Sequence, residues 1–228
     1  MKKTILLSVL LIASPIFAAK NLAEETKRMN ESASVLTEIM DAKDQSIPQD
    51  LLENAHCVGI VPNLKRIGLI VGAKYGKGVL SCRTSDGHGW SAPSVIRIEG
   101  GNIGLQIGAG ETDVVFVVMN AKGEDQLMKD KFTVGVDVTG MAGPVGRSAE
   151  AKTDALLRAE IVSYSRSHGL FAGVTLDGAT LRPDSEDNRD LYGREITQKE
   201  ILRGEVARPA GFDRLLATLN RYSPRKSG

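Results

Sequence analysis

Nine short segments rich in β-branched and other aliphatic residues recur between residues 58 and 176, separated by glycine, proline, asparagine or aspartate. Segments of this length and composition predict β-strands, and their regular recurrence predicts an antiparallel sheet system. The alternation of apolar and polar residues over 132–138 predicts a strand with one buried face, whereas 114–119 is apolar throughout and should be central. The segments are 58–61, 67–71, 79–83, 95–98, 103–107, 114–119, 132–138, 161–165 and 170–176.

The glycine content predicts the curvature and the core composition of this sheet. The 228 residues include 24 Gly but only 5 Phe, 4 Tyr and 1 Trp, so the core must be aliphatic and backbone segments must approach one another closely. In 103–107 the apolar residues share one strand face, and the glycines on the other face permit strong bending. We therefore expect an α+β fold: a Gly-rich antiparallel sheet curled toward a barrel or sandwich, flanked by an N-terminal helix and C-terminal helices.

The helices are expected outside the strand-rich region. Residues 21–44 carry apolar positions at helical spacing on an otherwise acidic helix, which predicts a helix docked on the sheet. A proline in the first turn predicts a second, short helix over 49–55. Further helices are expected over 122–129, 198–203 and 212–220.

The first residues have the three parts of a secretory signal peptide. Lys2 and Lys3 precede an apolar run over 5–12, and the small pair Ala18 and Ala19 follows. We expect a signal peptide over 1–18, cleaved after Ala18 or Ala19, and a single domain over 19–228, exported to the periplasm or cell envelope. An uncleaved membrane anchor is the alternative; acylation as a lipoprotein is not supported, because no cysteine lies at the cleavage region.

Charge excludes one class of partner. With 29 Lys+Arg against 28 Asp+Glu the chain is almost neutral and has no long basic run, so nucleic acid is a poor candidate. Cys57 and Cys82 both lie in the exported part, where an even number of cysteines can pair. A disulfide and two buried thiols both remain open, and a metal site is weaker because His56 has no companion ligands at suitable spacing.

No enzyme motif stands out. The glycine-rich strings 72–78 and 104–110 lack the spacing of a phosphate loop or a dinucleotide fingerprint. Residues 184–195 approximate a calcium loop but carry Arg189 where the sharp turn needs glycine, which favours a solvated turn. His88 and His168 adjoin glycines, yet no activated serine or cysteine signature accompanies them. We expect a non-catalytic protein without a metal or cofactor, and a hydrolase is the weakest alternative.

Six strings, in this order and spacing, resemble the SYLF domain family: CVGIVP at 57–62, GKGVL at 76–80, GWSAP at 89–93, GPVGR at 143–147, YSRSHGLFAG at 164–173, and 188–193. The resemblance covers roughly residues 30–205. It implies a phospholipid-binding module. Eukaryotic members of the family bind phosphoinositides (phosphatidylinositol phosphates), and some also bind actin. Exported bacterial members are single-domain proteins associated with phospholipid binding. This sequence differs from the eukaryotic pattern in two ways: it has no appended recognition domain, and its first helix lacks the basic amphipathic character that attachment by that helix would use. We therefore expect neither phosphoinositide specificity nor actin binding, and the partner that the resemblance implies is a phospholipid membrane surface.

Candidate lipid contacts follow from the residues near the predicted turns. Cations beside glycine or proline turns can meet a phosphate headgroup, and apolar residues nearby can enter the interface. The candidates are Lys65, Arg66, Lys74, Lys77, Arg83 and Arg147 as cations, with Trp90, Leu170 and Phe171 as an apolar rim. The alternatives are scattered solvated cations, a core strand at Leu170 and Phe171, a core position for Trp90, and an envelope structural or protein-interaction domain without lipid specificity.

Overall fold

The computed structural model describes residues 14–42, 46–68, 71–84, 89–103, 108–144, 156, 158–167, 170–174, 176–204 and 206–224. For residues 14–20, 68, 71, 102–103, 108–109 and 170–171 it describes the backbone alone. The helices are α1 (Ser14–Asp41), α2 (Gln49–Glu53), α3 (Ala121–Leu127), α5 (Ser185–Tyr192), α6 (Gln198–Leu202) and α7 (Asp213–Tyr222). The strands are β1 (Cys57–Gly68), β2 (Val71–Cys82), β3 (Ser94–Ile103), β4 (Gly108–Val118), β5 (Phe132–Thr133), β6 (Gly140–Ala142), β7 (Ile161–Ser167), β8 (Leu170–Gly173) and β9 (Ala179–Pro183).

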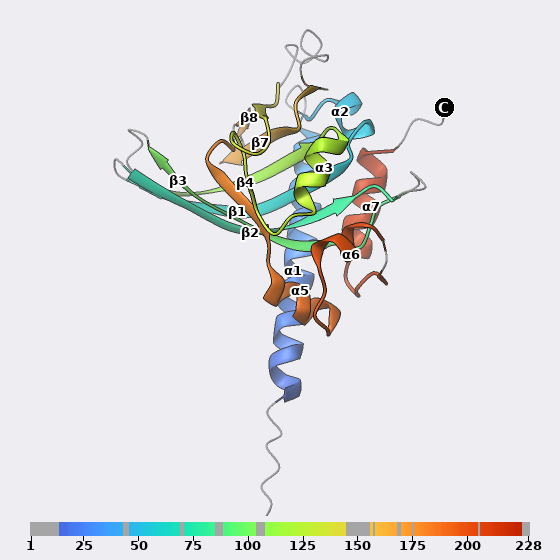
Figure 1. Ribbon diagram of the computed structural model, residues 1–228. Helices are drawn as coiled ribbons and strands as arrows, with labels where there is room; N and C mark the ends of the chain where they lie inside the picture. The colour runs from blue at the N-terminus through green and yellow to red at the C-terminus, as the bar shows by residue number, and fades with distance from the viewer. Residues whose placement is uncertain are drawn as a thin grey trace, which may run out of the picture.

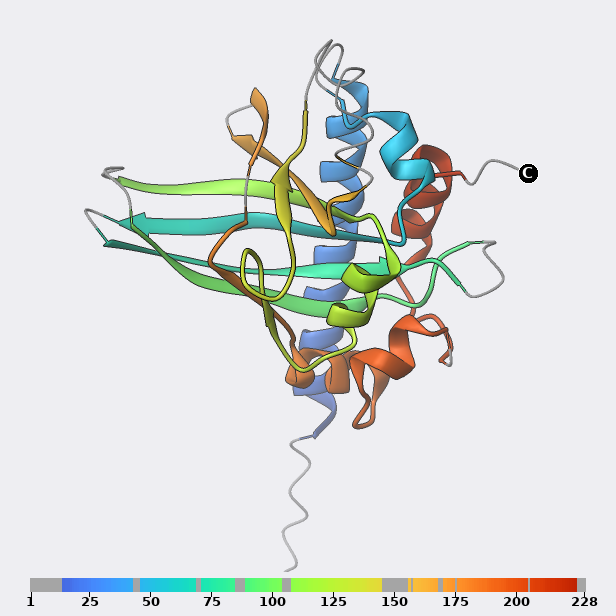
Figure 2. The same cartoon turned by 45° about the horizontal axis from the view of Figure 1, so that its top comes forward.

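The strands form one curled sheet that α1 crosses (Figures 1 and 2). Its order is β5-β9-β3-β2-β1-β4-β7-β6, with β8 paired to β7. This confirms the expected α+β class, the curled glycine-rich sheet and the flanking helices. Among the described strands, β6 and β7 form the one parallel pair, which the sequence did not predict.

Apolar layers cover both faces of the sheet. Helices α1, α2 and α7 pack on one face, which we call the α1 face, against Val58 and Ile60 of β1. On the opposite face Val61 and Leu64 pack with α3 and the segments around β5 and β9. This alternation along β1 is the strand periodicity expected for a sheet buried on both sides.

Helix α1 has the predicted apolar stripe. Met29, Ala33, Leu36 and Ile39 recur at helical spacing and are all buried against the sheet. Leu22, which the same periodicity placed in the stripe, is 39% exposed. In Figure 1 the N-terminal part of α1 extends beyond the body of the molecule. None of the described helices is both long enough and apolar enough to cross a membrane.

The prediction of a single strand over 132–138 is wrong. Only β5 is a strand there, and residues 135–137 form a turn that brings Val134 and Val138 together as a bridge. Gly135 has φ of 84°, and the Asp137 carboxylate accepts a hydrogen bond from the Thr133 N–H. The positive φ of Gly135 and this hydrogen bond stabilise a turn in place of the strand that the alternation predicts. Val136 lies in the turn and is 80% exposed.

The predicted turns around 62–66 and 72–78 are also wrong, because these residues lie inside the long strands β1 and β2. Gly76 and Gly78 are strand glycines whose missing side chains make room for β1. A Cβ on Gly78 would lie 2.2 Å from the Ile60 carbonyl oxygen, and one on Gly76 would lie 2.8 Å from Leu64. Glycine at these positions therefore marks a close strand approach rather than a turn.

Residues 185–192, predicted as a solvated turn, form helix α5. Asp184 is its N-cap, and the side chain accepts a hydrogen bond from the Asp187 N–H. The carboxylates that suggested a calcium loop therefore start a helix. No cluster of three or more metal-ligating side chains occurs in the part of the chain that the structure describes.

Candidate functional site

Strands β1 to β4 project together away from α2, α3 and α7, as Figures 1 and 2 show. We call the four aligned strand ends 65–68, 72–75, 99–102 and 108–111 the distal end. Strand register arranges them in rows, each with one residue from every strand. Because side chains alternate along a strand, successive rows face opposite sides of the sheet.

The first two of these rows carry no charge, and the pair Val71 and Ile103 lies beyond them on β2 and β3. The first is Gly108, Gly68, Gly72 and Asn102, and the second is Ala109, Ile67, Ala73 and Gly101. Ile67 is 67% exposed, which is unusual for a large aliphatic side chain in a strand. We call these two rows the tip: it is uncharged, and among its described side chains Ile67 is the large apolar one that protrudes.

The third row places two cations side by side. Arg66 and Lys74 are Cα partners across β1 and β2, and the outer members of this row are Gly110 on β4 and Gly100 on β3. Their side chains lie on the face opposite α1, because Lys74 Nζ donates to the Asp177 carbonyl oxygen at 3.3 Å beside β9. This row lies roughly 7 Å behind the row of Gly68 and Gly72, since a strand rises about 3.4 Å per residue.

The charge of Arg66 acts directly on the Lys74 ammonium group. Burial lowers the pKa of Lys74, the Arg66 charge lowers it further, and the Asp177 carboxylate partly opposes both. Within the described ranges no carboxylate forms an ion pair with Arg66 or Lys74. Like charges placed directly opposite in a sheet destabilise it, so this pair costs the fold free energy.

The fourth row faces α1 and contains Lys65, whereas Arg66 belongs to the third row on the opposite face. Lys65 lies between Glu111 and Tyr75 in the register, and Glu99 follows on β3. Lys65 is exposed and Tyr75 is 44% exposed. The adjacent cations Lys65 and Arg66 therefore point to opposite faces of the distal end.

Lys77 does not join the cation pair, because it lies in an ion-pair network on the α1 face. Its Nζ lies 2.9 Å from Asp184 and 2.7 Å from Asp187. Arg28 of α1 adds a contact with Asp187 at 3.6 Å and one with Glu25 at 3.2 Å. The network therefore ties α1 to β2 and α5.

The carboxyls of this network have opposite pKa shifts. Burial alone would raise the pKa of Asp184, but hydrogen bonds from Lys77 and the Asp187 N–H, with the charge of Arg97, hold it below its ordinary value. Burial raises the pKa of Glu25 to about 7, with a further contribution from Asp187 that Arg28 opposes. Glu25 is therefore the member of the network that gains a proton most readily.

This shift predicts how stability depends on pH. Because the pKa of Glu25 is higher in the folded protein than in the unfolded chain, the folded state holds the proton more tightly. The free energy of unfolding should therefore fall as pH rises from about 4.5 to about 7. Glu25→Gln, which imitates the protonated carboxyl, should gain roughly 3 kcal/mol relative to wild type between pH 4.5 and pH 8. Urea unfolding at both pH values measures this, with the exposed Glu24→Gln as control; an equal response of the two variants would contradict it.

Arg83 and Trp90 lie together at the other end of β2. The Arg83 guanidinium stacks over the Trp90 ring at 4.2 Å from its centroid and donates to Ser223 Oγ at 2.9 Å. Trp90 is fully buried, so the indole is a core residue. Arg83 and Trp90 are thus part of the contact between the sheet and the C-terminal segment, far along β2 from Lys74.

Three of the predicted contacts, Arg147, Leu170 and Phe171, have no described side chain. Arg147, like His88 and His168, lies outside the described residues. Leu170 and Phe171 belong to β8, where the backbone alone is described. Their roles stay predictions.

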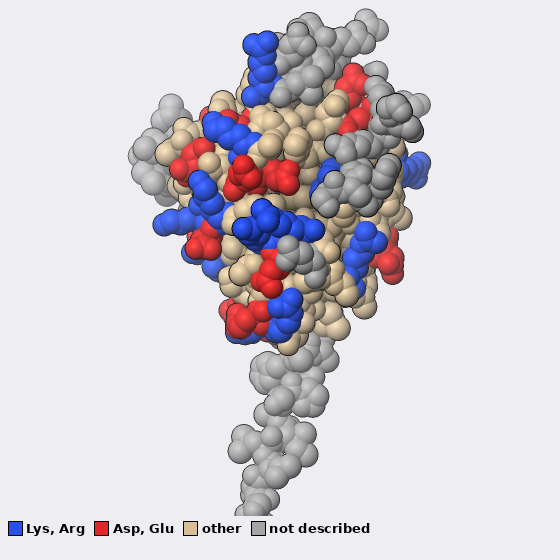
Figure 3. All heavy atoms as spheres, turned by 45° about the vertical axis from the view of Figure 1, so that its right-hand side comes forward, with Lys and Arg blue, Asp and Glu red and all other residues tan. Residues whose placement is uncertain are grey.

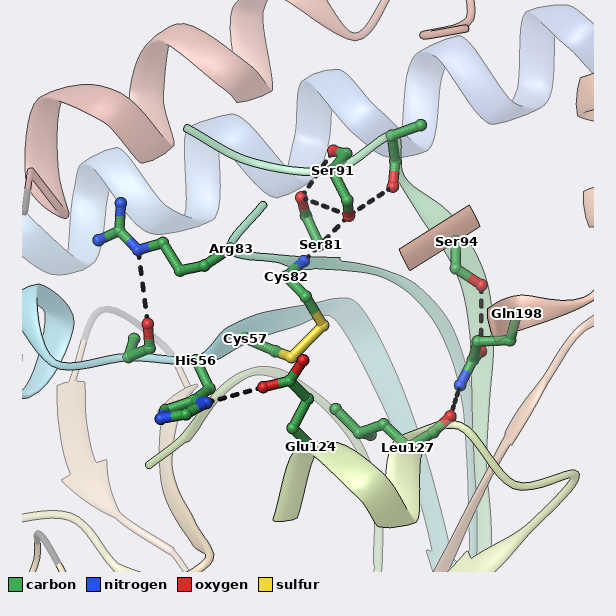
Figure 4. Close-up of a disulfide and its surroundings, with 12 residues drawn as sticks. His56, Cys57, Ser81, Cys82, Arg83, Ser91, Ser94, Glu124, Leu127 and Gln198 are labelled. Atoms are coloured by element: carbon green, nitrogen blue, oxygen red, sulfur yellow. Dashed lines mark hydrogen bonds and ion pairs between the residues drawn. A yellow bond between two sulfur atoms is a disulfide. The ribbon is translucent and has the colours of Figure 1, made fainter. Parts of the chain in front are cut away.

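Cys57 and Cys82 are joined by a disulfide (Figure 4). They are opposed residues of β1 and β2, both fully buried, at the end of the hairpin away from Arg66 and Lys74. Nearby, His56 Nδ1 lies 2.7 Å from Glu124 Oε2. The bridge therefore clamps the base of the long β1–β2 hairpin.

A groove of about 580 Å³ runs between α1 and the sheet. Its charged residues satisfy one another: Arg166 binds Asp113 at 2.7 Å and also contacts Glu38, while Arg214 donates to Ser34 at 2.9 Å. The surface in Figure 3 likewise mixes basic and acidic side chains. In contrast to Arg66 and Lys74, the groove cations already have acidic or hydroxyl partners.

Comparison with known proteins identifies the family. Residues 99–222 match the family described as Ysc84, "Las17-binding protein actin regulator". The chain belongs to the Ysc84 family, which is the SYLF domain family. The family description names a binding and regulatory role rather than an enzymatic one.

Relatives of the Ysc84 family align over most of this chain. An SH3 domain-containing protein of Schizosaccharomyces pombe is 37% identical over 199 residues, which is 83% of this chain and 46% of that protein. LAS seventeen-binding protein 3 of Saccharomyces cerevisiae is 35% identical over 221 residues, 92% of this chain and 47% of that protein. SH3 domain-containing YSC84-like protein 1 of Homo sapiens is 33% identical over 206 residues, 89% and 60% respectively. The chain thus spans about half the length of its curated relatives, and no solved structure matches it.

Proposed function

We propose that this Ysc84-family chain is a non-catalytic phospholipid-binding module that meets a membrane with the distal end of its sheet. The observation that carries the proposal is the order of the rows. An uncharged tip with Ile67 exposed comes first, and the Arg66 and Lys74 pair follows roughly 7 Å behind the row of Gly68 and Gly72. An apolar tip entering the headgroup boundary would bring these cations to the level of lipid phosphates.

In this proposal the protein is exported and works at the cell envelope. The secretory leader predicted over residues 1–18 supports export, and the Cys57–Cys82 disulfide suits an oxidising compartment. The lipid contacts are Arg66, Lys74 and Ile67, with Lys65 on the α1 face of the distal end. Lys77, Arg83 and Trp90 are assigned to structural contacts instead.

Vesicle co-sedimentation of the mature protein tests the proposal. Binding to vesicles containing an anionic phospholipid should exceed binding to neutral vesicles and should weaken as salt is raised. Arg66→Gln with Lys74→Gln should weaken anionic-vesicle binding roughly 30-fold, since each basic residue at a membrane surface contributes about 1 kcal/mol.

The matched control changes the same charge elsewhere. Lys129 and Lys199 are exposed and lie on the α3 and α6 side of the molecule, so Lys129→Gln with Lys199→Gln should bind as wild type. Equal losses in both double variants would mean that net charge alone drives adsorption. Absence of binding to every vesicle composition would refute the proposal.

A protein-binding role is the second candidate. It is favoured by the names of the relatives, among them LAS seventeen-binding protein 3. Cross-linking in envelope extracts that captures one protein partner, together with no vesicle binding, would favour this role over the first.

A further inference from the structure

We infer that Arg66 and Lys74 form a site for a doubly charged phosphate group, the dianion of a phosphomonoester, seated on the face of the distal end opposite α1. The inference deepens the proposed function, on which it rests for the membrane as the source of the ligand. The same chemistry would also bind a free phosphate or a soluble phosphomonoester.

The first support is a like-charge pair that the fold does not compensate. Arg66 and Lys74 are directly opposed across β1 and β2, where Cβ atoms lie about 5 Å apart. In the described part of the chain, the one hydrogen bond of Lys74 goes to a backbone carbonyl and Arg66 has no ion-pair partner. A bound anion would remove the repulsion between the two side chains.

The second support is the space around the pair. A Cβ built on Gly110, beside Arg66, would have nothing within 4 Å, so this side of the row is open. On the other side a Cβ on Gly100 would lie 2.8 Å from the Gly178 carbonyl oxygen and 3.1 Å from Lys74 Cε. The row is therefore closed beside Lys74 and open beside Arg66, and a ligand would be seated over Gly110.

The third support is the match of charge. A phosphomonoester carries a charge of about −1.5 to −2 at pH 7, whereas a phosphodiester carries −1. Asp177, whose charge acts on Lys74, lies beside that side chain, while Glu99 and Glu111 belong to the row that faces α1. Two adjacent cations, one of them a guanidinium that can bind two phosphate oxygens at once, complement the dianion better than the monoanion.

Two measurements with different sources test the site. The first titrates inorganic phosphate into the folded protein and follows backbone amide NMR signals of Arg66, Lys74 and Gly110. The second compares vesicles containing phosphatidate, a phosphomonoester lipid, with vesicles containing phosphatidylglycerol, a phosphodiester, at equal zeta potential. We expect saturable amide shifts and at least tenfold tighter binding to phosphatidate.

Two variants separate the site from general adsorption. Arg66→Gln with Lys74→Gln should abolish both the phosphate shifts and the phosphatidate preference without lowering the melting temperature, because it removes a repulsive pair. Gly110→Val keeps every charge and fills the open space beside Arg66, so it should lose the preference while retaining salt-dependent attraction to anionic vesicles. Lys129→Gln with Lys199→Gln should change neither readout.

The outcomes distinguish the inference from the proposed function. Equal binding to the two anionic lipids with no saturable phosphate shift would overturn the dianion site and leave membrane binding intact. Saturable phosphate shifts without binding to any vesicle would support the site, with a soluble phosphate as its source, and refute the membrane role. A phosphatidate preference that survives both Gly110→Val and the double glutamine variant would also overturn the assignment.

Discussion

Gly78→Ala is expected to destabilise the protein by roughly 3 kcal/mol or more, or to prevent folding altogether. The added Cβ would lie 2.2 Å from the Ile60 carbonyl oxygen and 2.8 Å from Val61 Cα. Both of these are backbone atoms of β1, so no side-chain rotation can relieve the overlap. Strands β1 and β2 would have to separate at the centre of the sheet.

Gly101→Ala is the matched control, because Gly101 is also a strand glycine and has no positive φ. Its Cβ would meet one atom within 4 Å, the Gly72 carbonyl oxygen at an ordinary 3.6 Å. Urea unfolding followed by circular dichroism should show the control within about 0.5 kcal/mol of wild type. If Gly78→Ala were as stable as the control, β1 and β2 would have to lie further apart at Gly78 than in this structure, and the prediction would be wrong.

Loss of the Cys57–Cys82 disulfide is expected to lower the free energy of unfolding by about 3 kcal/mol. The bridge joins residues separated by 25 positions, and closing a loop of this size in the unfolded chain accounts for that magnitude in the chain-entropy view. For a chain of 228 residues this corresponds to a melting temperature lower by roughly 6 to 12 °C. Calorimetry of Cys57→Ala with Cys82→Ala measures the shift.

Reduced wild-type protein is the control. It distinguishes the effect of losing the cross-link on the melting temperature from the effect of the side-chain volume removed in the double variant. It should melt close to the variant, because both lack the bridge and only the variant lacks the sulfur atoms. Vesicle binding should be unaffected below the melting temperature, since the bridge lies at the end of the hairpin away from Arg66 and Lys74. A double variant melting within 2 °C of oxidised wild type would contradict the prediction.

Much of the fold follows from short-range pattern. The apolar stripe of α1 and the all-apolar run that becomes β4 identify their elements from spacing alone. The sequence pattern gave wrong predictions where local hydrogen bonds or close strand packing determine the backbone conformation. Gly135 and Asp137 turn the chain inside an alternating segment, and Gly76 and Gly78 mark strand contacts rather than turns.

The candidate site was only partly predictable. Arg66 and Lys74 could be named from the sequence as cations near glycines, but so could Lys77 and Arg83, which bind Asp187 and Ser223 from segments more than 100 positions away. Nothing in the local sequence distinguishes a cation with a distant partner from one without. The exposed Ile67 could not be recognised either, because it sits in a strand segment that predicts burial.

By itself the sequence determined helices α1, α3, α6 and α7 and the apolar run of β4, because apolar spacing acts over a few residues. The tertiary structure decided which cations meet. The interval from Ile60 to Lys65 on β1 is one residue longer than the opposed interval from Val79 to Tyr75 on β2. This bulge, where Asn63 has φ of 52° and donates its N–H to Asp113, moves Arg66 to the face opposite Ile60. A single extra residue exchanges the two faces of a strand, and long-range pairing alone determines where it is inserted.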